Sequence, residues 1–273
     1  MTMLNDSVTR RRTGFRYLDE PTGVLAFAHR GGAFHPGIEG LENTLTAFRH
    51  AVALGYRYLE TDVHATRDGV LLAFHDTVLD RVTDRQGEIA ALTYAEVQRA
   101  LIGGREHVPT LAQLFDELPD ARFNIDIKAP AAVQPLADFI AARGAGDRVL
   151  VGSFSGRNLN RFREVTGDRI ATSAHPLEVV AFLLAPTGRI ARMLTRGRVS
   201  ALQIPHTRHR VRVANRWLIR KAHAVGTHVH VWTIDEPGEM RELLARGVDG
   251  LMTDRTDVLK DVLVEQGQWR EER

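Results

Sequence analysis

The sequence predicts one α/β domain folded as a distorted (β/α)8, or TIM, barrel. Short apolar runs rich in β-branched residues alternate with segments of helical period, which is the pattern of a parallel α/β sheet. Nine candidate strands are present for the roughly eight that such a barrel needs, so we expect one of them to lie outside it. No stretch rich in proline, serine or glycine divides the 273 residues, a length that one barrel can fill.

The expected elements follow from the apolar pattern in chain order. The predicted strands span 24–28, 57–63, 70–74, 122–127, 148–153, 169–173, 200–204, 228–234 and 249–253. The predicted helices span 44–54, 94–101, 110–117, 131–143, 215–225, 236–246 and 255–264. Asn43 or Thr44 can cap the first helix, and Gly55 ends it. The connection from Asp62 to Val70 is too short for a crossover helix, so the regular βα alternation breaks there.

Composition narrows the classes of protein. Hydrophobic residues make up 44% of the chain and charged residues 26%, the balance of an ordinary globular protein. The formal net charge of +2 does not favour nucleic acid as a partner. Because the chain has no cysteine, any metal must be held by oxygen or imidazole. No signal peptide or long apolar run is visible, so we expect a cytoplasmic protein with a polar arm over 1–20, the barrel over 21–264 and a polar tail over 265–273.

Two acidic side chains lie close together in the second predicted strand. Side chains alternate across a strand, so Glu60 and Asp62 project to the same face. Their neighbours Tyr58, Leu59 and Val63 are apolar, which argues against a solvated strand face. Like charges placed together in apolar surroundings indicate a cation site.

Other polar groups follow the ends of predicted strands. His29 and Arg30 follow the first strand, His75 follows the third, and Asp126 and Lys128 end the fourth. The carboxyl ends of parallel strands meet at one rim of a barrel, so we expect these groups to converge with the two carboxylates of the second strand.

The residue types at this rim suit metal-assisted chemistry on a phosphate group. Glu60, Asp62 and Asp126 can hold Mg²⁺ or Ca²⁺, with water and substrate oxygens completing the shell. Arg30 is a bidentate phosphate donor on a loop whose glycines let the backbone approach a ligand. Lys128 is one of only three lysines, which indicates a point charge at this position, although pairing with Asp126 is the rival explanation.

Three further residues each have two interpretations. Glu42 is either part of a helix start or a group close to the substrate. Asp76 either orients His75 or caps a turn. Trp232 is either a platform for a small polyol or a plug of the barrel.

The stretch 183–213 interleaves arginines with apolar residues. One interpretation is a basic amphipathic lip that makes weak contact with an anionic membrane surface. We favour the alternative, a solvated helix rich in arginine.

Seven short motifs resemble those of the glycerophosphodiester phosphodiesterases. They are HRGG at 29–32, ENT at 42–44, ETD at 60–62, HD at 75–76, DIK at 126–128, VWTID at 231–235 and GVDGLMTD at 247–254. Together and in this order they are highly specific, and the resemblance runs from about residue 24 to 260. The resemblance implies a TIM barrel that uses a divalent cation to hydrolyse small glycerophosphodiesters to sn-glycerol 3-phosphate and an alcohol.

The resemblance also implies roles for the rim residues. The metal ligands map to Glu60, Asp62 and Asp126, the acid/base pair to His29 and His75, and the phosphate contacts to Arg30 and Lys128. Family members often carry glutamate at the position of Asp126, so the identity of the metal, Mg²⁺ or Ca²⁺, is left open here.

The type of enzyme follows from the segment after His75. This segment, roughly 45 residues and helical in pattern, lacks the large inserted subdomain of some secreted relatives, so the chain resembles the cytosolic bacterial type. One alternative is a lysophospholipase D acting on lysolipids, which 183–213 would favour. A non-catalytic barrel that binds phosphodiesters is the other, and the complete set of motif residues argues against it.

Overall fold

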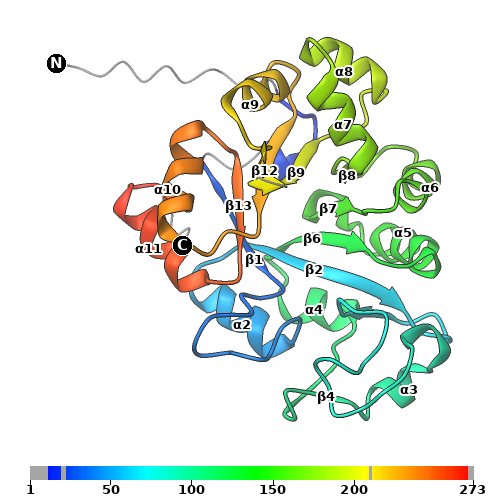
Figure 1. Ribbon diagram of the computed structural model, residues 1–273. Helices are drawn as coiled ribbons and strands as arrows, with labels where there is room; N and C mark the ends of the chain where they lie inside the picture. Colours follow the sequence, from blue (N-terminus) through cyan, green and yellow to red (C-terminus); the bar gives the residue numbers. More distant parts are fainter. Residues whose placement is uncertain (1–11, 20–22, 209–210, 270–273) are drawn as a thin grey trace.

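Eight parallel strands form a nearly closed barrel in the computed structural model, which describes residues 12–19, 23–208 and 211–269 (Figure 1). They are β1 (Leu25–His29), β2 (Tyr58–Ala65), β6 (Arg122–Ile127), β7 (Val149–Gly152), β8 (Ala171–Thr172), β9 (Ala201–Pro205), β12 (His228–Trp232) and β13 (Gly250–Thr253). Their order is β8-β7-β6-β2-β1-β13-β12-β9. The two edge strands, β8 and β9, meet through two hydrogen bonds of 2.9 Å. The N–H of Ala174 donates to the carbonyl of Ala201, and the N–H of Ser200 donates to the carbonyl of Thr172.

The ninth predicted strand, 70–74, lies outside the barrel. It forms β3 (Leu71–Ala73), which pairs antiparallel with the end of β2. The residues between β2 and β3 form a turn. The predicted break in the βα alternation is therefore confirmed, and the β2–β3 hairpin is the distortion.

Helices surround the barrel (Figure 1). They are α2 (Leu45–Ala53), α4 (Leu111–Glu117), α5 (Val133–Ala142), α6 (Gly156–Thr166), α7 (Pro176–Leu184), α8 (Gly188–Leu194), α9 (Arg216–His223), α10 (Pro237–Arg246) and α11 (Thr256–Glu265). As expected, Thr44 caps α2 by accepting a hydrogen bond from the N–H of Ala47. The sequence did not predict α6 or α7, and α8 is a helix rich in arginine within 183–213. No helix among the described residues has the length and apolar character needed to cross a membrane.

The segment between β3 and α4 differs from the prediction. The helix predicted over 94–101 ends early, as α3 (Tyr94–Val97), and a short hairpin of β4 (Leu101–Ile102) and β5 (Glu106–His107) follows. Apolar side chains of this segment pack with Leu72 of β3 and with Phe74, which follows β3. Together they form a separate cluster of Leu72, Phe74, Leu79, Ile89, Val97, Ala100, Ile102 and Val108. The apolar spacing that suggested a longer helix serves this tertiary cluster instead.

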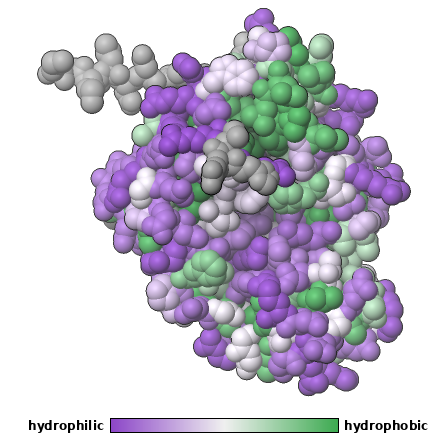
Figure 2. Space-filling model, viewed as in Figure 1, coloured by the Kyte–Doolittle hydropathy of each residue, from purple (hydrophilic) through white to green (hydrophobic). Residues whose placement is uncertain are grey.

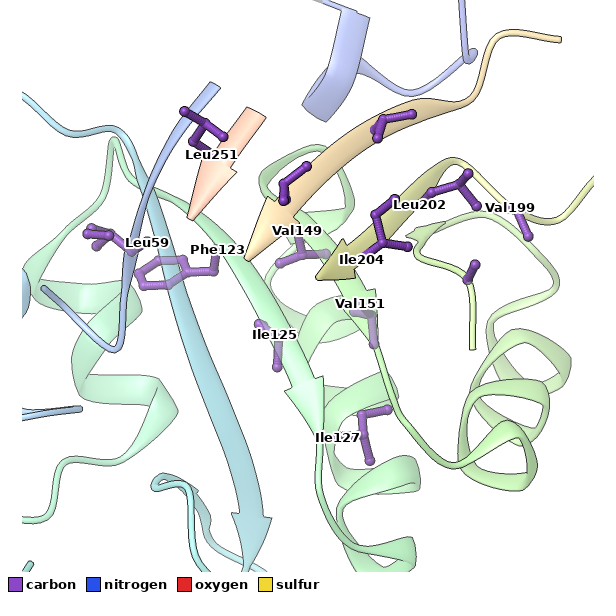
Figure 3. Packing of buried hydrophobic residues seen from close by; sticks show 14 of the residues in the cluster. Leu59, Phe123, Ile125, Ile127, Val149, Val151, Val199, Leu202, Ile204 and Leu251 are labelled. Carbon is purple, nitrogen blue, oxygen red and sulfur yellow. The ribbon is translucent and has the colours of Figure 1, made fainter. Parts of the chain in front are cut away.

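The main core lies between the barrel and its helices. Strand side chains such as Leu59, Phe123, Ile125 and Leu251 are fully buried on the outer face of the barrel (Figure 3). Alternate residues of the same strands point into the barrel. The helices therefore bury one face of each strand, and the other face is free to carry a site.

The N-terminal segment closes the end of the barrel that is opposite the carboxyl ends of the strands. Tyr17 and Leu18 of α1 (Arg16–Asp19) are fully buried, and the hydroxyl of Tyr58 donates to the carbonyl of Tyr17 at 2.9 Å. The described part of the predicted polar arm thus packs against the barrel. In the predicted tail, the ring of Trp269 packs edge-on against Tyr56 with centroids 5.1 Å apart.

Candidate active site

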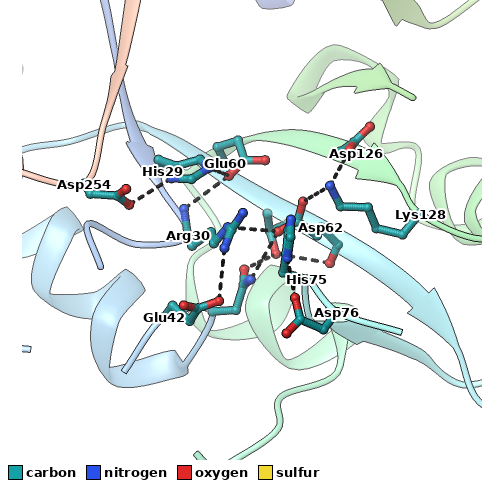
Figure 4. A network of polar contacts seen from close by, with 12 residues as sticks. His29, Arg30, Glu42, Glu60, Asp62, His75, Asp76, Asp126, Lys128 and Asp254 are labelled. Carbon is teal, nitrogen blue, oxygen red and sulfur yellow. Dashed lines mark hydrogen bonds and ion pairs between the residues drawn. The ribbon is translucent and has the colours of Figure 1, made fainter. Parts of the chain in front are cut away.

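Strand register brings the predicted polar side chains to one rim of the barrel (Figure 4). His29 at the end of β1 is level with Glu60 on β2, and Asp62 is level with Asp126 on β6. The N–H of Phe74 donates to the carbonyl of Asp62 at 3.0 Å, so the following His75 reaches the same rim from β3.

The HRGG loop after β1 turns so tightly that two of its residues must be glycine. Gly31 and Gly32 have φ angles of 87° and 90°. A Cβ on Gly31 would lie 2.7 Å from the Cβ of Ala47 on α2, and one on Gly32 would lie 2.6 Å from Cγ2 of Thr256 on α11. The loop backbone therefore packs directly on the first turns of two helices, which fixes the position of Arg30.

His29 is held between two carboxylates. Its Nδ1 lies 2.8 Å from Oδ1 of Asp254, and its Nε2 lies 3.8 Å from Oε2 of Glu60. Burial lowers the pKa of His29, but the charges of Glu60 and Asp254 and the hydrogen bond to Asp254 outweigh it, so the pKa is raised overall. A carboxylate beside Nδ1 keeps a ring proton on Nδ1 and leaves Nε2 for proton exchange with a ligand.

Asp254 should act as a positioning residue for His29. We expect Asp254→Asn to lower kcat by about tenfold, because the imidazole loses its orienting charge while Glu60 still lies beside Nε2. KM should stay close to wild type, since the substitution removes no group that we assign to substrate binding. Steady-state kinetics with a thermal melt checks this, and a changed KM with unchanged kcat would contradict the positioning role.

His75 has a similar partner on Nδ1, which lies 2.6 Å from Oδ1 of Asp76. The Nε2 of His64 lies 3.1 Å from the carbonyl oxygen of His75 and fixes the backbone there. Of the two interpretations of Asp76, the geometry therefore favours orientation of His75. Two histidines at this rim thus have a carboxylate on Nδ1.

Arg81 links the two loops that carry Glu42 and Asp76. Its guanidinium donates to both carboxylate oxygens of Glu42, at 2.8 and 2.6 Å, and to Oδ2 of Asp76 at 2.6 Å. Burial raises the pKa of Asp76, but hydrogen bonds from Arg81 and His75 outweigh it and lower this pKa to about 2. Glu42 also accepts from Nη1 of Arg30 at 3.2 Å, so its carboxylate is engaged by two arginines.

Lys128 lies between two carboxylates of the rim. Its Nζ is 2.8 Å from Oδ1 of Asp62 and 2.7 Å from Oδ2 of Asp126. Nε of Arg30 lies 3.4 Å from Oδ2 of Asp62. Pairing with Asp126, the rival explanation for Lys128, is thus present, and two cations flank Asp62.

The donor set at this rim fits a hard divalent cation in its chemistry. Glu60, Asp62 and Asp126 offer the carboxylate oxygens that Mg²⁺ and Ca²⁺ prefer. Among the described residues, no three His, Asp or Glu side chains are grouped closely enough to hold a metal ion. Lys128 lies between two of these carboxylates, Asp62 and Asp126. Burial and repulsion from Asp62 raise the pKa of Glu60 to about 7, although the charges of His29, Lys128 and Arg30 act in the opposite direction. A divalent cation beside Glu60 would relieve that repulsion. The assignment of Glu60, Asp62 and Asp126 as its ligands stays a prediction.

Trp232 ends β12 at the same rim and is only partly buried. Its ring meets the exposed Phe154 edge-on, with centroids 5.8 Å apart, and Nζ of Lys128 lies 5.8 Å from the centroid of Phe154. Trp232 is thus connected to Lys128 through Phe154, and it also packs against a cluster of buried residues that includes Phe27, Tyr58 and Met252. Both the platform and the plug interpretation are compatible with this position.

Sequence reasoning missed three members of this network. Asp254 is part of the GVDGLMTD motif but was given no role, although its place after the last strand could have signalled the rim. Asn43 was considered only as a helix cap, and its side-chain amide donates to Oδ2 of Asp62 at 3.3 Å. Arg81 lies in an irregular loop, and no pattern marked it.

Known proteins resemble this chain in sequence and in fold. A model of the Glycerophosphoryl diester phosphodiesterase family matches residues 29–258. The chain is 41% identical over 251 residues to the Probable glycerophosphodiester phosphodiesterase 2 of Mycobacterium tuberculosis, covering 90% of this chain and 93% of that one. It is 28% identical over 271 residues to the lysophospholipase D GDPD1 of Homo sapiens, covering 86% and 85%. The crystal structure of a glycerophosphodiester phosphodiesterase from Agrobacterium tumefaciens superposes with a TM-score of 0.69 at 22% identity, covering 86% of this chain and 98% of that one.

Proposed function

Because this chain belongs to the glycerophosphoryl diester phosphodiesterase family, we propose that it hydrolyses glycerophosphodiesters to sn-glycerol 3-phosphate and an alcohol, with His29 and His75 as its acid/base pair. The protein is a phosphoric diester hydrolase, as its family is. One observation carries the proposal for the residues. Two histidines reach the same rim from different strands, and each has a carboxylate on Nδ1.

This arrangement suits proton transfer at two sides of one phosphate. One imidazole takes the proton of the attacking O–H at Nε2, and the other donates a proton from Nε2 to the leaving alkoxide. Asp254 and Asp76 hold the two rings in the required tautomer and stabilise the charged form. The nucleophile is either water or the neighbouring glycerol hydroxyl, and a transient cyclic phosphate in the product mixture would identify the second route.

Positive charge at the rim would neutralise the phosphodiester. Arg30 and Lys128 lie on either side of Asp62, so a phosphate there can accept from a guanidinium and an ammonium. A divalent cation held by Glu60, Asp62 and Asp126 would add charge against the phosphate oxygens and stabilise the transition state. Trp232 and Glu42 complete the proposed substrate side, the first as an apolar surface and the second by fixing Arg30.

The direct test is release of glycerol 3-phosphate. We expect the protein with a divalent cation present to release it from glycerophosphocholine and glycerophosphoethanolamine, as measured by mass spectrometry or a coupled glycerol 3-phosphate assay. A phosphomonoester such as glycerol 2-phosphate should remain intact, because the proposed reaction cleaves a diester and stops at a monoester, glycerol 3-phosphate. Folded protein that releases nothing with any ion would contradict the proposal.

Lysolipids are a second candidate substrate, because α7 and α8 expose large apolar side chains and α8 exposes arginines. A lysophospholipase D would release choline from lysophosphatidylcholine. Comparing that release with choline release from glycerophosphocholine at equal concentrations distinguishes the two candidates.

A further inference from the structure

An apolar face is exposed on the helices that follow β8. On α7 it comprises three residues of one helical side, Leu177, Val180 and Leu184, which are 76%, 45% and 79% exposed. On α8 and α9 it continues with Ile190, Met193, Leu194 and Trp217, which are 37% to 69% exposed. Figure 2 shows apolar residues gathered over α7 and α8. Soluble proteins rarely expose so many large apolar side chains together unless the face meets a partner.

The helices that carry this face are rigidly held. Arg163 on α6 makes a buried two-pronged ion pair with Glu178 on α7, at 2.7 and 3.1 Å. Nζ of Lys221 on α9 donates to the carbonyl of Ala185 at 2.8 Å. A Cβ on Gly188 would lie 2.2 Å from the carbonyl oxygen of Lys221, so the start of α8 needs glycine to approach α9 this closely. The face is therefore a preformed surface and not a loosely packed end of the fold.

Its surroundings are strongly basic. From 179 to 234 the chain has nine arginines, one lysine and no aspartate or glutamate, although the whole chain has a net charge of only +2. Arg189, Arg192 and Arg196 are exposed on α8 and just after it, and Arg220 is exposed on α9. Within the described part of the chain, Arg189, Arg196 and Arg220 form no salt bridge. Their guanidinium groups are therefore available to an anionic partner.

A pocket of about 340 Å³ opens beside the apolar face. It is lined by Leu177 and Leu194 of the face, by Arg196 and Arg198, and by two acidic residues, Glu164 and Glu178. Arg198 pairs with Asp168 at 3.1 Å, which leaves Arg196 as the unpaired cation of the pocket. Glu178 is paired with Arg163, so Leu177, Leu194 and Arg196 remain as possible contacts for a molecule with an acyl chain and a phosphate.

Charge decides between the possible occupants. If a second copy bound through the same face, the arginines of the two copies would be brought together, and that repulsion opposes the contact. An anionic bilayer instead matches both features, because its phosphates pair with arginine and its acyl boundary accepts the leucines.

We propose that the α7–α8 face, together with Trp217, docks on the surface of an anionic phospholipid bilayer. Leu177, Val180, Leu184 and Met193 enter the headgroup boundary, and Arg189 and Arg196 pair with lipid phosphates. This inference does not depend on the reaction that the site performs.

The test is sedimentation of the full chain with vesicles of phosphatidylcholine alone and of phosphatidylcholine with phosphatidylglycerol at roughly 3:1. We expect binding to the anionic vesicles only, weakening as salt rises. The double substitution Leu184→Glu with Met193→Glu should weaken binding at least about tenfold, because two apolar side chains no longer enter the boundary. Arg189→Gln should weaken binding about fivefold, because the attraction of one arginine to the anionic surface is lost.

The matched control is Val264→Glu, which places one glutamate, as each of the two face substitutions does, at a 54% exposed position on α11, outside the face. It should bind as wild type does, and all variants should hydrolyse a soluble glycerophosphodiester equally. Wild-type protein that ignores anionic vesicles, or face variants that bind them normally, would overturn the proposal. A wild-type dimer that the face variants convert to monomer would assign the face to a second copy instead.

Discussion

Replacing His29 or His75 by alanine is expected to lower kcat for glycerophosphodiester hydrolysis by at least about 100-fold. Each substitution removes the only imidazole that serves one side of the phosphate in the proposed scheme. Asp254 and Asp76 cannot replace it, because each is bound to the Nδ1 side of its histidine and not to the side that faces a ligand. Steady-state kinetics on glycerophosphocholine measures the effect.

A control separates lost chemistry from lost folding. His107→Ala removes an exposed histidine on β5, whose Nδ1 lies 2.7 Å from the carbonyl oxygen of Gln98 and which has no role in the proposed scheme. It should turn over at the wild-type rate. The His29 and His75 variants should melt near the wild-type temperature, and turnover near wild type in both of them would refute the acid/base assignment.

The strands and their polar ends were predictable because they are local features of the sequence. An apolar run that ends in histidine or aspartate, such as the one before His29, identifies both a barrel strand and its rim residue. Parallel register then brings Asp62 level with Asp126 without any further information. The barrel and the grouping of the polar residues could therefore be derived from pattern alone.

Partners that meet only through barrel closure or through the geometry of a loop could not be derived in this way. Asp254 contacts His29 across 225 positions of sequence, because β13 pairs with β1. Arg81 lies in a loop without periodic structure and reaches Glu42 across 39 positions. Ion pairs of this kind depend on loop geometry, which apolar periodicity does not encode.

The extent of the helix over 94–101 and the burial of two residues in the arm could not be predicted, for a different reason. The predicted helix over 94–101 ends at Val97 because its apolar residues serve a tertiary cluster with Leu72. Tyr17 and Leu18 are only two apolar residues in a segment that is otherwise mostly polar, too few to predict that they close the barrel. In both cases tertiary packing overrides the local pattern.

Removal of divalent cations is expected to lower hydrolysis at least about tenfold, with activity restored by Mg²⁺, Ca²⁺ or Mn²⁺. The physical reason is the charge balance of the rim, where the buried Glu60 lies close to Asp62 and the cationic side chains favour Asp62. The measurement is glycerol 3-phosphate release by chelator-treated protein in parallel reactions with each ion or none. The ion that restores activity at the lowest concentration identifies the preferred metal.

Substitution of Asp126 turns this into a test of one ligand. Asp126→Asn should raise the concentration of ion needed for half-maximal activity by about 10- to 100-fold, because a charged oxygen ligand is lost. Asp126→Glu keeps the charge on a longer arm, so it should retain cation-dependent activity while changing the relative effect of Mg²⁺ and Ca²⁺. If Asp126→Asn responds to ions as wild type does, Asp126 serves to hold Lys128 and is not a ligand. If chelator-treated protein is fully active, the positive charge against the phosphate must come from Arg30 and Lys128 alone.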